Sequence, residues 1–163
     1  MSNSKPNYFQ RRTKPQGPRA NERIRALDVQ VIGSDGGNLG VMPLKNAIEA
    51  AKDAGAGLIF TADCGTKDVA AVDYANSLGI DVIITDHHDI PKKLPPADAI
   101  LNPKLLSHES PYSGLAGVGV AYILALTLAQ TLNKTEGIIA SLLELFTLGT
   151  IADLAPLIGV NRR

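Results

Sequence analysis

The stretch IDVIITDHH, residues 80–88, is an apolar, β-branched run that ends in one aspartate and two adjacent histidines. A continuous apolar run of this length predicts a buried strand, as does LIFTA at residues 58–62, which we expect to be covered on both faces. Between the two runs, apolar positions at helical spacing from Val69 to Leu78 predict a helix that Gly79 ends. Strand, helix and strand within some 28 residues indicate a βαβ unit with parallel strands.

A hairpin and a helix are predicted upstream of this unit. DVQVI, residues 28–32, alternates as a short strand does, GSDGGN at residues 33–38 is a turn signal, and residues 39–42 form the second strand. Apolar residues spaced along residues 44–51 predict a helix with Gly55 as its C-cap. The pattern leaves open whether this hairpin joins the parallel sheet.

Two helices are predicted downstream. PKKLPP, residues 91–96, is a loop, and residues 99–101 are a candidate edge strand. GLAGVG, residues 114–119, opens a long apolar helix over residues 120–132, and a second helix covers residues 138–148. Because this last helix carries almost no charge, we expect it to be buried. The expected fold class is α/β, with a three-layer core around the parallel unit.

Composition sets the broad class of the protein. The 163 residues are 45% hydrophobic, enough for a buried core, and hold one cysteine, Cys64. A lone cysteine excludes an internal disulfide and favours a cytoplasmic location. The sequence has neither an apolar stretch long enough to span a membrane nor a secretory signal, so no membrane partner is expected.

The first part of the chain is basic. Residues 1–56 carry nine Lys or Arg against five Asp or Glu, although the net charge of the chain is zero. Residues 1–20 contain no acid, and with their prolines we expect them to form a disordered arm. Such arms often contact nucleic-acid phosphates, and a solvated tail is the alternative. The candidate contacts are Arg11, Arg12, Lys14 and Arg19.

Polar side chains follow both parallel strands where the strands end. Asp63 follows the first, and Asp86, His87 and His88 follow the second. The carboxyl ends of parallel strands line the ligand crevice of open α/β sheets, so these groups converge if the strands are neighbours. Carboxylate and imidazole together suit Mn²⁺ or Mg²⁺. The alternatives are that the aspartates, Asp153 in GTIADLAP included, only cap helices or turns, and that the histidines bond a loop.

Four motifs resemble those of the DHH phosphoesterase superfamily, above all the RecJ family of single-strand-specific DNA exonucleases. They are TADCG, IITDHH, YSGLAGVGVAYIL and LGTIADLAPLIGVNRR, in this order, and the resemblance as a whole covers roughly residues 56–163. The resemblance implies a two-manganese site and 5′-to-3′ hydrolysis of single-stranded DNA.

The same resemblance assigns roles to individual residues. It implies that Asp63 bridges the metals and that His87 and Asp153 are metal ligands. His88 and Asp86 become the candidate catalytic residues: His88 contacts the scissile phosphate and Asp86 orients the histidines. In the glycine-rich motif, Gly117 and Gly119 would allow a phosphate to approach the start of a helix, or alternatively serve tight helix packing.

The N-terminal part resembles a different family. The run from the basic arm through RANERIRALDVQVIGSDGGNLGVMPLKNAIEAAKDAG is similar to the N-terminal domain of bacterial translation initiation factor three. This resemblance implies ribosomal RNA or the small ribosomal subunit as a partner of residues 1–55, with residues 21–55 as the folded segment. The two patterns meet near residues 54–58, so the chain is expected to be a chimera.

The expected chimera lacks part of the exonuclease pattern. That family begins with an Asp-x-Asp motif that supplies two further metal ligands, and Asp35 in the hairpin turn is a poor substitute. The family's second domain is also missing from the 163 residues. Two-metal catalysis needs both ions, so we expect weak or single-site metal binding and impaired activity. A chimeric chain that folds without activity is the remaining alternative.

Overall fold

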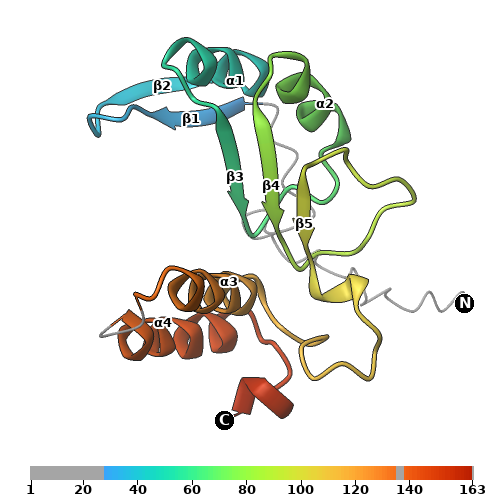
Figure 1. Ribbon diagram of the computed structural model, residues 1–163. Coiled ribbons are helices and arrows are strands. Elements are labelled where there is room, and N and C mark those ends of the chain that lie inside the picture. Colours follow the sequence, from blue (N-terminus) through green and yellow to red (C-terminus); the bar gives the residue numbers. More distant parts are fainter. Residues whose placement is uncertain (1–27, 135–137, 163) are drawn as a thin grey trace, which may run out of the picture.

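The computed structural model describes residues 28–134 and 138–162, and it has a mixed α/β fold (Figure 1). The expected basic arm, residues 1–20, lies outside the described residues, so Arg11, Arg12, Lys14 and Arg19 are not placed. Among the residues described, no helix is both long enough and apolar enough to cross a membrane.

The predicted βαβ unit is confirmed. Strand β3 (Leu58–Ala62) leads into helix α2 (Val69–Ser77), which returns the chain to strand β4 (Asp81–Thr85). The two strands pair in parallel and in register from Leu58 opposite Asp81 to Ala62 opposite Thr85. Strand β5 (Ala99–Leu101) pairs in parallel with β4, which gives a sheet of order β3-β4-β5 with β5 as the predicted short edge strand.

The hairpin does not join the parallel sheet. Strands β1 (Asp28–Ile32) and β2 (Asn38–Pro43) form a separate antiparallel sheet with a bulge near Ile32. Helix α1 (Leu44–Asp53) follows directly and packs on both of its strands. The hairpin stands at the side of β3 in Figure 1, and the question left open by the sequence is thereby answered.

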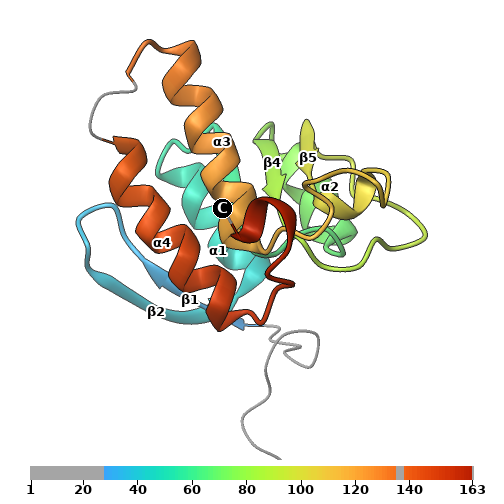
Figure 2. The ribbon, with the colours of Figure 1, turned by 90° about the horizontal axis from the view of Figure 1, so that it is seen from below.

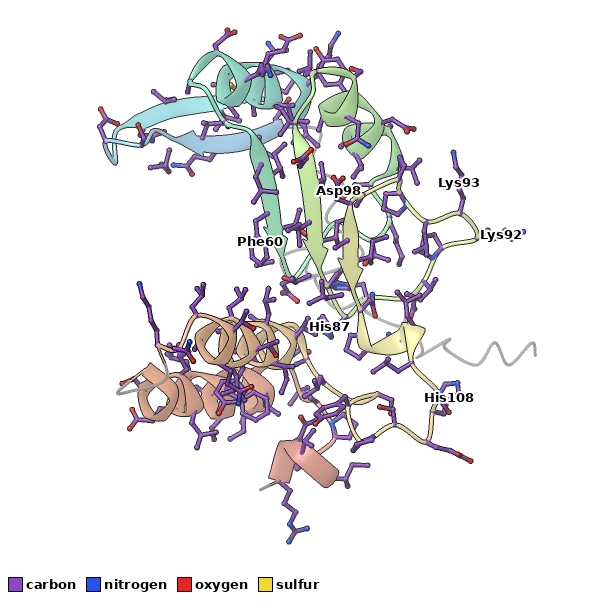
Figure 3. All side chains as sticks on the ribbon, in the orientation of Figure 1. Phe60, His87, Lys92, Lys93, Asp98 and His108 are labelled. Carbon is purple, nitrogen blue, oxygen red and sulfur yellow. The ribbon has the colours of Figure 1, made fainter. Side chains whose placement is uncertain are left out.

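One core lies between the parallel sheet and the helices α1 and α2. Its buried members are apolar side chains of α1, of α2, of β4 and of the residue before β4, namely Ile48, Val72, Ala75, Ile80, Val82 and Ile84. Strand β4 is buried as predicted, but β3 is covered on one face only, since Leu58 is 51% exposed and Phe60 49%. Phe60 points away from β4 in Figure 3. The prediction for β3 was wrong because an apolar run does not tell whether a second layer of structure reaches an edge strand.

The last two helices form a hairpin beyond the carboxyl ends of the strands (Figures 1 and 2). Helices α3 (Gly117–Thr131) and α4 (Ile138–Ala152) lie side by side and bury Leu115, Val120 and Phe146 between them and the neighbouring segments. Close approach of the helices depends on Gly149, where a β-carbon would lie 2.8 Å from Val118 Cγ1.

The composition of helix α4 predicted that it is buried, and this prediction was wrong. Leu145, Leu148 and Ile151 are 58%, 66% and 54% exposed, whereas Phe146 and Thr150 are buried. Only the side of α4 that faces α3 is covered by the described residues, because this helix lies at the edge of the molecule (Figure 2). A low charge makes the faces of a helix suitable for burial, but it does not determine whether another element covers them. Since only one face of α4 is covered, the other faces remain exposed to solvent.

Candidate metal centre

The site forms where β3 and β4 end. Because these strands are neighbours in register, the residues that follow them, Asp63 and Asp86 to His88, come together at one edge of the sheet. His87 lies below the carboxyl end of β4 and faces α3 (Figure 3). The backbone N–H of Asp63 donates to the carbonyl of Thr85 at 2.9 Å, and the backbone of Asp63 has φ +64°.

Two carboxylates approach the ring of His87 from opposite sides. Asp63 Oδ1 lies 3.0 Å from His87 Nε2, and Asp153 Oδ2 lies 3.6 Å from His87 Nδ1. The His87 side chain is mostly buried, while those of Asp63 and Asp153 are 64% and 36% exposed. The predicted ligands are therefore close together, but Asp63 and Asp153 contact different nitrogens of one ring.

Asp63, His87 and His88 have the chemistry of a cation site. Each offers one ligand atom, and these atoms lie within 4.8 Å of one another. Neighbouring ligands of an octahedral ion with bonds of about 2.1 Å lie about 3 Å apart, which matches the spacing of Asp63 and His87. The single carboxylate oxygen and the two imidazole nitrogens of this group suit Mn²⁺ and Mg²⁺.

Asp86 is buried and saturated with hydrogen bonds. Its Oδ1 accepts from the backbone N–H of His87 at 2.8 Å and of His88 at 3.2 Å, and lies 2.7 Å from His88 Nδ1. Its Oδ2 accepts from the backbone N–H of Thr66 at 3.0 Å. Burial alone would raise the pKa of Asp86, but hydrogen bonds from the Thr66 hydroxyl, from His88 and from the backbone outweigh it and hold that pKa well below its usual range. Asp86 is therefore a carboxylate that contacts the backbone of both histidines and His88 Nδ1, and its role in orienting the histidines stays a prediction.

The two glycines of the GLAGVG motif have different surroundings. Gly117, the first residue of α3, faces Asp63, so a β-carbon there would lie 2.9 Å from Asp63 Cγ. Gly119 faces Leu115 and Phe146, where a β-carbon would lie 2.7 Å from Leu115 Cδ2. Gly117 thus belongs to the site, whereas the surroundings of Gly119 are those of tight helix packing.

A cleft of about 290 Å³ opens between Asp63 and Asp153. The start of α3 and the end of α4 form the rest of its lining, through Ala116, Gly117, Val118, Gly149 and Ala152. Small side chains line these helix ends, so a group of the size of a phosphate can reach the carboxylates.

Two buried residues near the histidines were missed by the sequence reasoning. Thr66 is fully buried and Asn102 is 5% exposed, and Asn102 Nδ2 donates to Thr66 Oγ1 at 3.1 Å. The signal in the sequence was weak, since Asn102-Pro103 is typical of the end of a strand and Thr66 of a turn. Only the three-dimensional arrangement, which joins positions 36 residues apart, reveals the pair.

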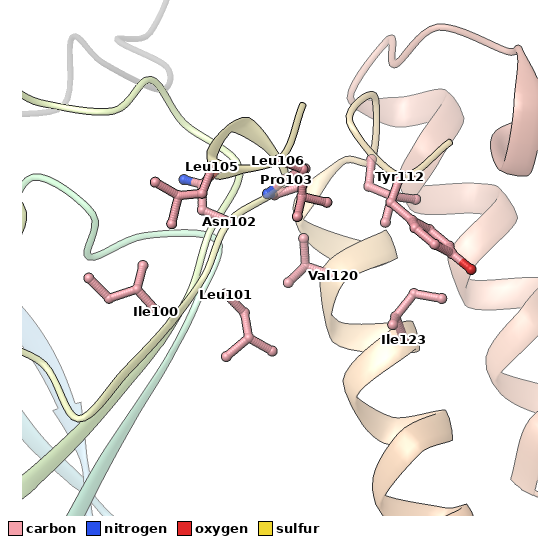
Figure 4. A pocket seen from close by; sticks show the side chains of 10 residues that line it. Ile100, Leu101, Asn102, Pro103, Leu105, Leu106, Tyr112, Val120 and Ile123 are labelled. Atoms are coloured by element: carbon pink, nitrogen blue, oxygen red, sulfur yellow. The ribbon is translucent and has the colours of Figure 1, made fainter. Parts of the chain in front are cut away.

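An apolar pocket of about 340 Å³ lies behind these residues (Figure 4). Asn102 brings an amide to a lining that is otherwise aliphatic and aromatic, made of Ile100, Leu101, Pro103, Leu105, Leu106, Tyr112, Leu115, Val120 and Ile123. Hydrogen bonds of Asn102 therefore form against an apolar wall, where they are electrostatically stronger than in water.

Comparisons with known proteins identify the family. The profile described as "DHH family, N-terminal domain" matches residues 4–150. The chain belongs to the DHH family. Among curated relatives, this DHH-family chain is 45% identical over 124 residues to the single-stranded-DNA-specific exonuclease RecJ of Salmonella typhimurium. That match covers 71% of this chain and 22% of the exonuclease, so the chain spans about a fifth of the length of this relative.

Solved structures give the same result. The crystal structure of exonuclease RecJ bound to manganese has a TM-score of 0.63 and 32% identity, and the match covers 76% of this chain and 30% of that one. The predicted α/β fold with a parallel DHH-type unit is thereby confirmed.

The second resemblance is also confirmed. Translation initiation factor IF-3 of Myxococcus xanthus is 54% identical over 41 residues, which cover 25% of this chain and 17% of the factor. A DHH domain with exonuclease relatives over most of the chain, together with a short match to an initiation factor, is consistent with a chimera.

Proposed function

We propose that this DHH-family chain binds a single divalent cation, Mn²⁺ in preference to Mg²⁺, as the remaining part of a phosphoesterase site that acts on single-stranded DNA. The observation that carries the proposal is the 3.0 Å approach of Asp63 Oδ1 to His87 Nε2, beside a cleft open to solvent. Manganese in the matched RecJ crystal structure supports the choice of ion.

Each residue of the site has a role in this proposal. Asp63 and His87 Nε2 hold the ion. Asp153 lies on the Nδ1 side of His87, so its role as a further ligand requires its carboxylate to turn toward the ion. When bound, such an ion polarises a phosphoryl oxygen and activates water. His88, fixed through Nδ1 by Asp86, is free to contact the scissile phosphate with Nε2. The absence of a side chain at Gly117 leaves room for Asp63.

We further propose that hydrolysis is impaired. Within the described part of the chain, the three residues Asp63, His87 and His88 are the one group found that has a metal-ligand arrangement. Asp35 accepts a hydrogen bond from the backbone N–H of Gly37 at 2.9 Å in the turn of the separate hairpin sheet, where it serves that turn. Among residues 28–134 and 138–162, ligands for a second ion are therefore lacking. Groups that act as a unit lose most of the rate when one part is removed.

The experiment is thermal unfolding with and without Mn²⁺, for the unaltered protein, His87→Ala and His108→Ala. His108 is exposed and outside the candidate site, so it controls for loss of an imidazole. A transition that rises with Mn²⁺ in the unaltered protein and in His108→Ala, but not in His87→Ala, supports the proposal, because a ligand that binds only the folded state raises its stability. No rise in any of the three proteins contradicts it.

Cleavage is tested separately. Labelled single-stranded DNA is incubated with the protein and Mn²⁺ beside an intact RecJ exonuclease. We expect cleavage that is slower by orders of magnitude, or none. A rate that approaches that of the intact enzyme would show that two ions are held after all.

A ribosome-binding module is the second candidate. The match to translation initiation factor IF-3 favours it, and residues 28–55 fold into the hairpin and helix α1. Sedimentation with small ribosomal subunits, lost on deletion of residues 1–20, would support a role for the basic arm. Absence of co-sedimentation at low salt, where phosphate contacts are strongest, would exclude it.

A further inference from the structure

One buried amide joins the loops that follow all three parallel strands. Asn102, which directly follows β5, donates through Nδ2 to Thr66 Oγ1 in the loop after β3, at 3.1 Å, and to the carbonyl of His88 after β4, at 3.0 Å. Its Oδ1 accepts from the backbone N–H of Lys104 at 2.9 Å. Both donors and the acceptor of the side chain are thereby used, in a position only 5% exposed.

The hydrogen bonds continue from Asn102 to the site. Because Thr66 Oγ1 accepts a hydrogen bond from Asn102, the Thr66 hydroxyl directs its own hydrogen to the carboxylate of Asp86. The backbone N–H of Thr66 also donates to Asp86 Oδ2 at 3.0 Å. Asp86 Oδ1 in turn lies 2.7 Å from His88 Nδ1. The hydrogen bonds therefore run from the amide of Asn102 through the hydroxyl of Thr66 and the carboxylate of Asp86 to the imidazole of His88. The residues Asn102, Thr66 and Asp86 are buried.

This order of donors and acceptors determines the form of the histidine. A carboxylate beside Nδ1 requires the proton of neutral His88 to sit on Nδ1, which leaves the lone pair on Nε2. The second contact of Asn102, to the His88 carbonyl, fixes the backbone of the same residue. Asn102 therefore acts on His88 from two directions.

We infer that Asn102 and Thr66 are positioning residues, which hold His88 in one orientation and one tautomer through Asp86. The inference rests on the proposed phosphoesterase site for its functional meaning. Asparagine is required because the position needs two donors and one acceptor, and threonine because a hydroxyl must accept and donate at once.

A merely structural role for Asn102 is the competing explanation, since its Oδ1 also caps the short 3-10 turn Pro103–Leu105. Asn102→Asp separates the two, because aspartate keeps the acceptor for Lys104 N–H and loses both donors. Thr66→Val removes the hydroxyl at nearly constant shape, and Thr66→Ser restores it. Asn76→Asp is the matched control, since Asn76 lies on an exposed part of α2 and its Nδ2 donates to the carbonyl of Pro96.

The measurement is the imidazole ¹⁵N spectrum of the metal-free protein, above the usual histidine pKa of about 6.5. The chain has three histidines, and His108→Gln and His87→Gln assign the signals. We expect His88 protonated on Nδ1 in the unaltered protein, in Thr66→Ser and in Asn76→Asp, and a mixture of tautomers in Asn102→Asp and Thr66→Val. If Asn102→Asp does not fold, Thr66→Val decides. A single unchanged tautomer in the folded variants would overturn the inference and leave a structural role only.

Mn²⁺ titration separates this inference from the proposed function. We expect the Kd for Mn²⁺ to rise about tenfold in Thr66→Val, because Asp86, which Thr66 holds, also accepts a hydrogen bond from the backbone N–H of the metal ligand His87. We expect the Kd to recover in Thr66→Ser. If the unaltered protein does not bind Mn²⁺, the proposed function fails while the tautomer result still tests the inference. If it binds Mn²⁺ and Thr66→Val binds equally well with an unchanged His88 spectrum, the inference fails alone.

Discussion

Substitution of Gly117 by alanine tests whether the start of α3 determines the position of Asp63. A β-carbon at Gly117 would overlap Asp63 Oδ1, and it would lie 2.9 Å from Asp63 Cγ and 3.2 Å from Asp63 Cβ, whereas ordinary contacts begin at 3.4 Å. Asp63 Oδ1, the oxygen that faces His87 Nε2, must therefore move out of the way, and Cγ must retreat by about 0.5 Å, the difference between 3.4 and 2.9 Å. The backbone of Asp63 cannot easily follow, because its N–H is bonded to the Thr85 carbonyl.

A retreat of this size matters for metal binding but little for stability. Ligand distances in metal sites are held to about 0.2 Å, so the pair formed by Asp63 and His87 would no longer match one ion. We expect the Kd for Mn²⁺ to rise about tenfold or more, the usual effect of losing a group that supports a ligand. Alanine is the better helix former by up to about 1 kcal/mol, which offsets part of the strain, so the unfolding temperature without metal should change little.

Isothermal titration with Mn²⁺ and thermal unfolding without it measure the two effects. Gly119→Ala is the matched control, since its β-carbon would meet Leu115 and Phe146 and not Asp63. We expect Gly119→Ala to lower the unfolding temperature and to keep the Kd of the unaltered protein. An unchanged Kd in Gly117→Ala would refute the role of this glycine in placing Asp63.

Two further predictions concern stability. The pKa of Asp86 in the folded state lies below the value of about 3.9 expected in the unfolded state. The ionised carboxylate therefore stabilises the fold fully at a pH above about 3.9, and this stabilisation is progressively lost as the pH falls further. Urea unfolding from about pH 7 to pH 3 measures the difference in free energy of unfolding between the unaltered protein and Asp86→Asn. We expect this difference to shrink in acid by at most about 1.4 kcal/mol per pH unit. A difference that stays constant with pH would contradict this. Ile84→Ala should lower the free energy of unfolding by about 2–5 kcal/mol because Ile84 is fully buried. Phe60→Ala should lower it by only about 1 kcal/mol because Phe60 is half exposed. Equal losses in urea unfolding would contradict the finding that one face of β3 is exposed.

The sequence by itself determined the elements and the chemistry at their ends. Hydrophobic runs and helical spacing are local properties, so β3, α2 and β4 could be located from residues 58–85 alone. Parallel strands place their carboxyl ends at one edge, which is why the pattern of residues was sufficient to expect Asp63 and His87 within contact distance.

Tertiary structure decided what depends on partners distant in the chain. Burial of β3 and of α4 was overestimated because an apolar segment does not specify how many layers will cover it. The packing of the strands and helices places Asp63 and Asp153 beside different nitrogens of His87. The same packing allows Asn102 to join the loops that follow the three parallel strands. A hydrogen bond between residues 36 positions apart has no local signature, because its geometry exists only once the sheet has brought both ends together.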